Sequence, residues 1–167
     1  MHLSTPTLDN LYAVLPWRAA CPEALRTTRV LTRADQRKFY RAVIRNPQSP
    51  HRYYAVMRGR VFLGLVSLEH IDRVNGHAEI GLIIDPAHAG QGYGREAVRL
   101  VLQKARALKL QTIFGEVYEC NVAGLAFWSR IVIHHGGTAT TWPRRKLWKG
   151  RLYDALLFTI PLDRRGQ

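Results

Sequence analysis

The sequence predicts an α/β fold in which one mixed, mostly antiparallel sheet carries helices on both faces. Helical patterns come first along the chain, then antiparallel strands, then a strand–helix–strand unit, and finally a helix and a hairpin. A glycine-spaced turn joins a central strand to the longest helical segment. The length of 167 residues suits one domain with a substantial core, so we expect a single domain spanning 1–167.

The N-terminal part predicts two amphipathic helices. Apolar residues recur at helical spacing over 8–18 and again over 33–45. Thr32 is a suitable N-cap for the second helix, and Asp35 falls in its first turn. A loop with two prolines at 46–50 ends this helical part.

The rest of the chain alternates strand and helix patterns. A turn at Arg58-Gly59-Arg60 separates the first two strands, and Asn75-Gly76 leads into the third. In chain order we expect strands at 52–57, 61–71 and 77–84, a helix at 93–108, a strand at 112–118, a helix at 123–131, and a terminal antiparallel pair at 133–142 and 152–160 joined by a basic loop.

Composition narrows the class of protein. Hydrophobic content of 47% is ordinary for a globular protein, and no apolar run approaches the roughly 20 residues that a membrane span needs. The N-terminus lacks the basic and apolar regions of a signal peptide. Cys21 and Cys120 show no metal-ligand spacing. We therefore expect two free thiols, a cytoplasmic protein without membrane contact, and no metal site.

The segment from Asp85 to Ala97 carries the strongest functional signal. Gly90, Gly92 and Gly94 alternate where a strand gives way to a helix, so the backbone can bend sharply and let a ligand approach closely. The helix would direct its unpaired N–H groups and positive dipole end at that ligand, which suits a pyrophosphate. The spacing Gly-x-Gly-x-Gly matches neither the Walker loop nor the dinucleotide fingerprint.

That spacing resembles the acetyl-CoA loop of the GCN5-related N-acetyltransferase (GNAT) family, Arg/Gln-x-x-Gly-x-Gly/Ala, with Ala89 at the position where Arg or Gln is usual. The run from Glu116 to Asn121, followed by an apolar helix, adds to the resemblance. The most similar subgroup acetylates protein N-termini, including those of ribosomal proteins. Segments 49–54 and 64–68 are similar to acetyltransferases of nucleotide-linked amino sugars.

The resemblance implies a GNAT fold, in which two central strands, here His77–Ile84 and Thr112–Tyr118, splay into a V-shaped acetyl-CoA cleft. It leaves little chain for the family's first strand, which we expect to be very short or missing. Acetyl-CoA is the implied co-substrate, its pantetheine arm held by strand backbone and by Asn121, and its pyrophosphate by the glycine turn. The implied cofactor-binding residues are Leu82, Ile83, Ile84, Gly90, Gln91, Gly92, Tyr93, Gly94, Arg95, Asn121 and Trp128.

Two carboxylates are candidate general bases. Glu116 matches the base of the N-terminal acetyltransferases, and Glu79 matches the base of members that work through water. Each could instead be a solvated or salt-bridged strand residue. The family's acid, a tyrosine seven residues after the asparagine, is replaced by Trp128, whose indole N–H cannot deliver a proton. Either water or the acceptor supplies that proton, or another group does, and the candidates are Tyr118, His134 and Tyr153.

Net charge is +13, with a sequence pI near 10.6. Coenzyme A is an anion and accounts for a few of these charges. One basic cluster is interleaved with aromatic residues, as on many nucleic-acid-binding surfaces, although a solvated hairpin with inward aromatics would look the same. The cluster comprises Arg144, Arg145, Lys146, Lys149 and Arg151, with Trp142, Trp148 and Tyr153.

The leading hypothesis is an acetyl-CoA-dependent N-acetyltransferase acting on a primary amine, as a monomer or homodimer. The acceptor would be a protein N-terminus, the amino group of a nucleotide-linked sugar, or another small anionic amine, with the basic segment from Trp142 to Tyr153 bordering its site. The alternative is a protein that binds or modifies nucleic acid on the same fold.

Overall fold

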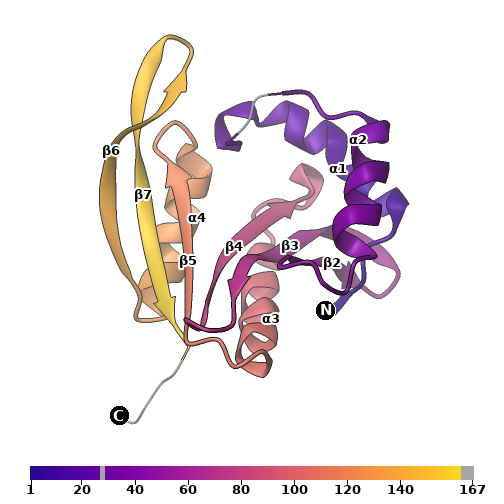
Figure 1. Cartoon of the computed structure of the whole chain (residues 1–167). Helices are drawn as coiled ribbons and strands as arrows, with labels where there is room; N and C mark the ends of the chain where they lie inside the picture. Colours follow the sequence, from indigo (N-terminus) through magenta and orange to yellow (C-terminus); the bar gives the residue numbers. More distant parts are fainter. Residues whose placement is uncertain (27–28, 163–167) are drawn as a thin grey trace.

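The computed structural model describes residues 1–26 and 29–162. Within these residues the chain forms a seven-stranded mixed sheet in the order β1-β2-β3-β4-β5-β7-β6, with helices on both faces (Figure 1), which confirms the predicted fold class. In chain order the elements are β1 (His2–Ser4), α1 (Leu8–Ala20), η1 (Pro22–Ala24), α2 (Arg33–Phe39), η2 (Tyr40–Ile44), β2 (Arg52–Arg58), β3 (Val61–Asp72), β4 (His77–Ile84), η3 (Pro86–His88), α3 (Tyr93–Ala107), β5 (Thr112–Tyr118), α4 (Val122–His134), β6 (Thr138–Trp148) and β7 (Arg151–Pro161).

Two apolar clusters hold the helices on the two faces of the sheet. The larger one includes the buried side of α3, whose alanine, valine and leucine residues recur at helical spacing. The smaller one packs α1 against the opposite face through Leu11, Val14, Ala55 and Leu65. No helix in the described part of the chain is long and apolar enough to cross a membrane.

The N-terminal elements form as the sequence predicts. Thr32 caps α2: its hydroxyl accepts the N–H of Asp35 at 3.2 Å, and the Asp35 carboxylate accepts the N–H of Thr32 at 2.8 Å. The helical path continues to Ile44, with a π-helical final turn. The short first strand is confirmed, because β1 has three residues and pairs with β2.

The C-terminal hairpin differs from the prediction in two ways. Helix α4 continues to His134, so residues 133–134 are helical and β6 begins only at Thr138. Burial of Ile131 and Val132 against the core favours helix there over the strand preference of β-branched residues. The prediction of a basic loop between the two strands is also wrong. β6 runs through that segment to Trp148, and the chain turns at Lys149–Gly150, where both residues have positive φ. A register shift between Trp142 and Lys146 accommodates the extra length.

The two central strands diverge as the resemblance implies. β4 and β5 run parallel, and only three pairs are in register, ending at Glu79 and Phe114. Both strands continue well beyond this point, so the edge of β4 that faces β5 is unpaired with it from Ile80 to Ile84. Polar side chains of β4 and β5 therefore lie near the point where the two strands separate.

Candidate active site

The glycine turn has the backbone geometry of an anion site. Gly90 and Gly92 have φ values of +74° and +81°, which L side chains rarely adopt, and a Cβ on either would meet no atom within 4 Å. Gly92 is the N-cap of α3 and offers no side chain to cap the helix. The first N–H groups of α3 therefore remain available to an anion, and open space lies beside them.

The other residues of the turn serve different purposes. A Cβ on Gly94 would lie 3.1 Å from the Phe127 ring, so this glycine allows α3 and α4 to approach closely. The Tyr93 hydroxyl accepts a hydrogen bond from Arg58, whose guanidinium lies 5.7 Å from the ring centroid. Gln91 and Arg95 are exposed at the start of the helix.

The free edge of β4 suits an extended ligand. Leu82, Ile83 and Ile84 pair with β3 on one side, and their other edge faces the V. A pantetheine arm carries amide groups that can hydrogen-bond such an edge as a further strand would. The predicted backbone contacts therefore have unpaired edge groups available to make them.

Asn121 and Trp128 lie on α4, the helix that follows β5. Asn121 is the N-cap of α4, and its Oδ1 accepts the N–H of Gly124 at 3.0 Å, which leaves its amide NH₂ group to donate elsewhere. Trp128 stacks on Phe158 with ring centroids 4.8 Å apart and meets Phe127 edge-on. Packing is the main role that these contacts give to the indole ring.

Glu79 and Glu116 lie on the same face of the sheet, one on each diverging strand, and a single arginine bridges them. Arg26 Nε donates to Glu116 Oε1 at 2.7 Å, and its two terminal nitrogens donate to the Glu79 carboxylate, one of them at 3.1 Å. The Arg26 side chain is 49% exposed, whereas those of Glu79 and Glu116 are 12% and 7% exposed. The structure thus brings the two predicted bases together under a guanidinium.

Glu116 has two more partners. Tyr118 donates its hydroxyl hydrogen to Glu116 Oε1 at 2.8 Å, and Arg145 Nε donates to Oε2 at 3.1 Å. Burial disfavours the charged carboxylate, but the hydrogen bonds from Arg26 and Tyr118 and the two arginine charges outweigh burial. The pKa of Glu116 is therefore lower than usual, and the carboxylate is a weak base while Arg26 is bound.

The three candidate acids fall in different places. Burial, followed by the hydrogen bond to Glu116, raises the pKa of Tyr118 to about 12, so this phenol keeps its proton at neutral pH. His134 ends α4, a 13-residue helix, and lies about 18 Å along it from the Asn121 end. Tyr153 pairs with Lys146 and packs against Arg151, 5.0 Å from its guanidinium carbon to the ring centroid. Only Tyr118 contacts a candidate base among these three.

A cavity of about 390 Å³ opens beside Glu116, lined by Arg26, Tyr118, Arg145, Lys146 and Leu147. Lys146 is 7% exposed, and its ammonium lies 4.6 Å from the centroid of the Tyr118 ring. Burial lowers the pKa of Lys146, and no carboxylate pairs with it among the described residues. The lining therefore contains three cations and no acidic side chain.

The segment that carries Arg26 is held over this cavity by two further contacts. Lys146 donates to the carbonyl of Leu25, and the Cys120 thiol lies 3.6 Å from the carbonyl of Glu23. Cys21 and Cys120 are both free thiols, as the sequence predicts. The segment after α1 reaches over the open end of the V (Figure 1).

Two polar residues at this site were missed by the sequence analysis. Arg26 gives no local signal, because its partners are 53 and 90 residues away in the chain. Glu69 of β3 lies beside Gly81 of β4, where a Cβ would come within 2.8 Å of the carboxylate. The strand alternation of β3 and its position opposite Glu79 could have indicated Glu69.

The comparison with protein families identifies the chain. The family model of the acetyltransferase (GNAT) domain matches residues 1–131. The chain belongs to the GNAT acetyltransferase family. It is therefore an acyltransferase that uses acetyl-CoA, as the sequence resemblance implies. A search of curated proteins found no match.

Solved structures share the fold of this enzyme at low sequence identity. Spermidine N-acetyltransferase from Vibrio cholerae in complex with CoA and spermine aligns with a TM-score of 0.82 at 18% identity, covering 96% of this chain and 94% of that one. An acetyltransferase from Salmonella typhimurium with acetyl-CoA gives 0.78 at 18% identity, covering 100% and 96%. Ribosomal-protein-alanine N-acetyltransferase from Brucella melitensis gives 0.77 at 16% identity, covering 96% and 99%. These likenesses establish the fold, and two of these proteins are named for different acceptors, spermidine and the alanine of a ribosomal protein.

Proposed function

We propose that this enzyme acetylates a primary amine on an acceptor that also carries a negative charge. The cavity lined by Arg26, Arg145 and Lys146 supports the proposal, because it lies beside Glu116 and has no acidic side chain in its lining. A carboxylate or phosphate of the acceptor would bind Arg145 and Lys146 through charge-assisted hydrogen bonds. The amine of the same molecule would then reach Glu116.

The donor side follows from the glycine turn and the free edge of β4. Gly90 and Gly92 leave space for the pyrophosphate at the start of α3, and Leu82 to Ile84 present backbone groups to the pantetheine arm. Acetyl-CoA supplies the thioester that is the acetyl donor. A backbone N–H on this edge would stabilise the oxygen of the acetyl carbonyl as it gains negative charge.

Proton transfer depends on the release of Arg26 from the two carboxylates. An ammonium group entering between Glu79 and Glu116 would replace the guanidinium and its hydrogen bonds. With Arg26 gone, the pKa of Glu116 rises toward its usual value, so Glu116 becomes a better base just when an amine is present. Glu116 takes one proton, the neutral amine forms the new C–N bond, the C–S bond breaks, and the nitrogen loses its second proton to water. Tyr118, protonated and in contact with Glu116, is the group that we propose to protonate the thiolate, and it regains its proton from Glu116.

Two other acceptor classes fit the site less well. A polyamine such as spermine, which is bound in the Vibrio cholerae structure, has no anionic group that Arg145 and Lys146 could bind. Nucleic acid would need bare aromatic rings for stacking. Here Arg145 lies 4.3 Å from the Trp142 centroid, and Lys149 lies 5.7 Å from that of Trp148. The chain's own cations already contact these rings, which favours a small acceptor.

The test is acceptor profiling with the purified chain and acetyl-CoA, following release of free thiol. The panel should contain matched pairs that differ in one anionic group: an amino sugar with and without a linked nucleotide, and peptides with acidic or basic second residues. Spermidine and single-stranded RNA complete it. We expect at least tenfold higher kcat/KM for the anionic member of each pair. Equal rates within pairs, or a preference for spermidine, would overturn the proposed acceptor class.

A further inference from the structure

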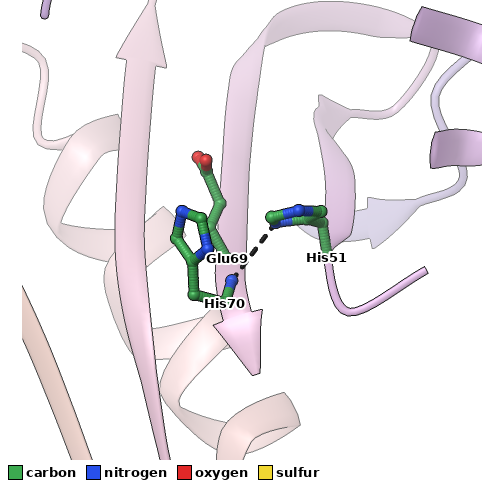
Figure 2. A group of neighbouring side chains, drawn as sticks. All are labelled: His51, Glu69 and His70. Atoms are coloured by element: carbon green, nitrogen blue, oxygen red, sulfur yellow. Dashed lines mark hydrogen bonds between the residues drawn. The ribbon is translucent and has the colours of Figure 1, made fainter. Parts of the chain in front are cut away.

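A second cluster of polar side chains lies on the sheet outside the glycine turn and the cationic cavity. His51 directly precedes β2, and Glu69 and His70 are neighbours in β3 (Figure 2). One nitrogen of each imidazole and one oxygen of Glu69 all lie within 4.8 Å of one another. The two imidazole rings meet edge-on with centroids 4.9 Å apart.

The backbone of β3 is irregular where this cluster forms. Successive residues of a regular strand point to opposite faces, so Glu69 and His70 should lie on different sides of the sheet. His70 instead has a φ of +50°, and the pairing of β3 with β4 shifts register between Glu69 and Asp72. This conformation is uncommon for a residue other than glycine, and such irregularities gather at functional sites. It brings the His70 ring next to Glu69.

His51 joins the cluster through the strand register, and other groups orient the ligands. Arg52 pairs with Leu68, so His51 stands level with Glu69 on the neighbouring strand. The Ser67 hydroxyl donates to Glu69 Oε1 at 2.8 Å. The backbone N–H of His70 donates to His51 Nδ1 at 3.2 Å, the dashed line in Figure 2. The Ser67 hydroxyl is the kind of partner that orients a metal ligand, whereas the bond to His51 Nδ1 occupies a nitrogen that could bind the ion.

We propose that His51, Glu69 and His70 bind one divalent first-row transition-metal ion, with Zn²⁺ as the best match. Two imidazoles and one carboxylate are a donor set that such ions accept, whereas Mg²⁺ and Ca²⁺ prefer oxygen ligands. In a tetrahedral site, bonds of about 2.0–2.2 Å place ligand atoms about 3.3–3.6 Å apart. The ligand atoms, now within 4.8 Å of one another, must therefore move closer, and His70 is the exposed side chain of the three.

Binding exchanges one hydrogen bond for a coordinate bond. The lone pair of His51 Nδ1 now accepts the His70 N–H, so an ion that binds this nitrogen breaks that hydrogen bond. The exposed His70 N–H would then donate to water instead. Three protein ligands leave at least one coordination position of the ion open to a water or an anion. Glu69 pairs with Glu79 across β3 and β4, so the ion would lie on the side of the sheet that carries the acceptor site.

The experiment titrates the metal-free full-length chain with Zn²⁺ by calorimetry and with Co²⁺ by visible absorption. We expect one ion per chain, and affinity at least tenfold weaker in each of His51→Ala, His70→Ala and Glu69→Gln. A His134→Ala/His135→Ala variant is the matched control, because these two rings also lie 4.9 Å apart but belong to no such cluster. It should bind as the parent does.

A thermal melt distinguishes lost binding from lost folding. Zn²⁺ should raise the Tm of the parent and of the His134/His135 variant, and should leave the Tm of a folded His70→Ala variant unchanged. The absence of stoichiometric binding by the parent would overturn the proposal. So would binding that survives in the three cluster variants, or binding that is lost when Cys21 and Cys120 are both replaced by serine.

Discussion

Arg26 is the residue whose contacts decide how the two candidate bases behave. Its guanidinium bridges Glu79 and Glu116, and the first of these hydrogen bonds is the main reason that the pKa of Arg26 itself lies above its usual value. Through its hydrogen bond to Glu116 and its charge, Arg26 also lowers the pKa of Glu116. Half of the Arg26 side chain is exposed, so a ligand can reach and replace it.

Replacing Arg26 by glutamine should therefore change the pH dependence of catalysis. A base is active when it is deprotonated, and Arg26 keeps Glu116 deprotonated to lower pH. Without the charge, the pKa of Glu116 rises, and the acid limb of the kcat/KM profile moves to higher pH. The KM for the acceptor should fall, since no internal cation competes. Arg29→Gln is the control, because Arg29 pairs with Asp35 on α2. An acid limb that stays in place in Arg26→Gln would contradict this role.

The two carboxylates should differ in importance. Glu116→Gln is expected to lower kcat by about 10²- to 10⁴-fold, the usual contribution of a positioned general base. Glu79→Gln should act mainly through acceptor KM, because we assign Glu79 to holding the ammonium group. Steady-state kinetics across pH checks both variants, and circular dichroism confirms that they fold. A larger kcat loss in Glu79→Gln would mean that Glu79 is the base and that Glu116 holds the ammonium group.

The residues of the site could be predicted where a local sequence pattern of the family marks them. They could not be predicted where a residue reaches the site through partners that are distant in the chain. The sequence placed Glu116 near the end of the strand that is β5, as observed, whereas Asn121 lies beyond β5 as the N-cap of α4. Arg26 and Lys146 reach the site through contacts that span 53 to 121 residues, and no periodicity reports such contacts. The His51 cluster depends on a left-handed His70, which sequence alternation argues against.

The turn between β4 and α3 can be tested as the binding site of the pyrophosphate. Gly92→Val should abolish acetyl-CoA binding, since the side chain would occupy the space open to the pyrophosphate. Its positive φ also predicts a loss of about 1–2 kcal/mol in unfolding free energy. Gly59→Val is a matched control: Gly59 has a φ of +59° and open space around it, in the β2–β3 turn. Calorimetry should show loss of binding in Gly92→Val alone. Similar affinities in the two variants would show that the pyrophosphate does not bind at this turn.

Elements were predictable where one periodicity dominates. The stripe of buried residues on α3 repeats every three to four positions, and the helix formed within a residue of the expected bounds. The stretch Ile131-Val132-Ile133 suits a strand as well as a helix, and burial of Ile131 and Val132 against the core favours α4. The basic segment was expected to be a loop, but antiparallel pairing with β7 carries it into the sheet, which charge patterning cannot predict.

The molecule as a whole should lose stability in acid. Hydrogen bonds, including those from Thr32, lower the pKa of Asp35 to about 2, and the pKa values of Asp72, Glu96 and Glu116 are also lowered. A carboxylate with a lowered folded pKa contributes stability above its unfolded pKa, about 4, and the contribution disappears as pH falls through the folded value. Thermal melts should show Tm falling from about pH 4 toward pH 2. Asp35→Asn should lower Tm at pH 7 and match the parent near pH 2. A constant difference between the two across pH would contradict the assignment.

The net charge of +13 should also speed capture of the acceptor. β6 and β7 project beyond β5 at the open end of the V (Figure 1), and their outer part carries Arg144, Lys149 and Arg151. Exposed cations around a site raise the on-rate of an anion, and salt screens this effect over about 10 Å at 0.1 M. We expect kcat/KM for an anionic acceptor to fall severalfold between about 0.02 M and about 0.5 M salt, because the Debye length becomes shorter over this range. Changing these three residues to glutamine should flatten that dependence and leave kcat unchanged.

The control for this prediction removes two positive charges at the far end of α3. Lys104 and Arg106 end α3, far along the helix from the glycine turn, and replacing both by glutamine should leave the salt dependence close to that of the parent. Nucleic acid makes a different prediction, because its affinity falls with a steep logarithmic salt slope set by the number of phosphates neutralised. Tight RNA binding with such a slope, lost in the hairpin variant and retained in the α3 variant, would contradict a small acceptor. The projecting hairpin would then be the nucleic-acid contact of an enzyme that acetylates an amine carried on RNA.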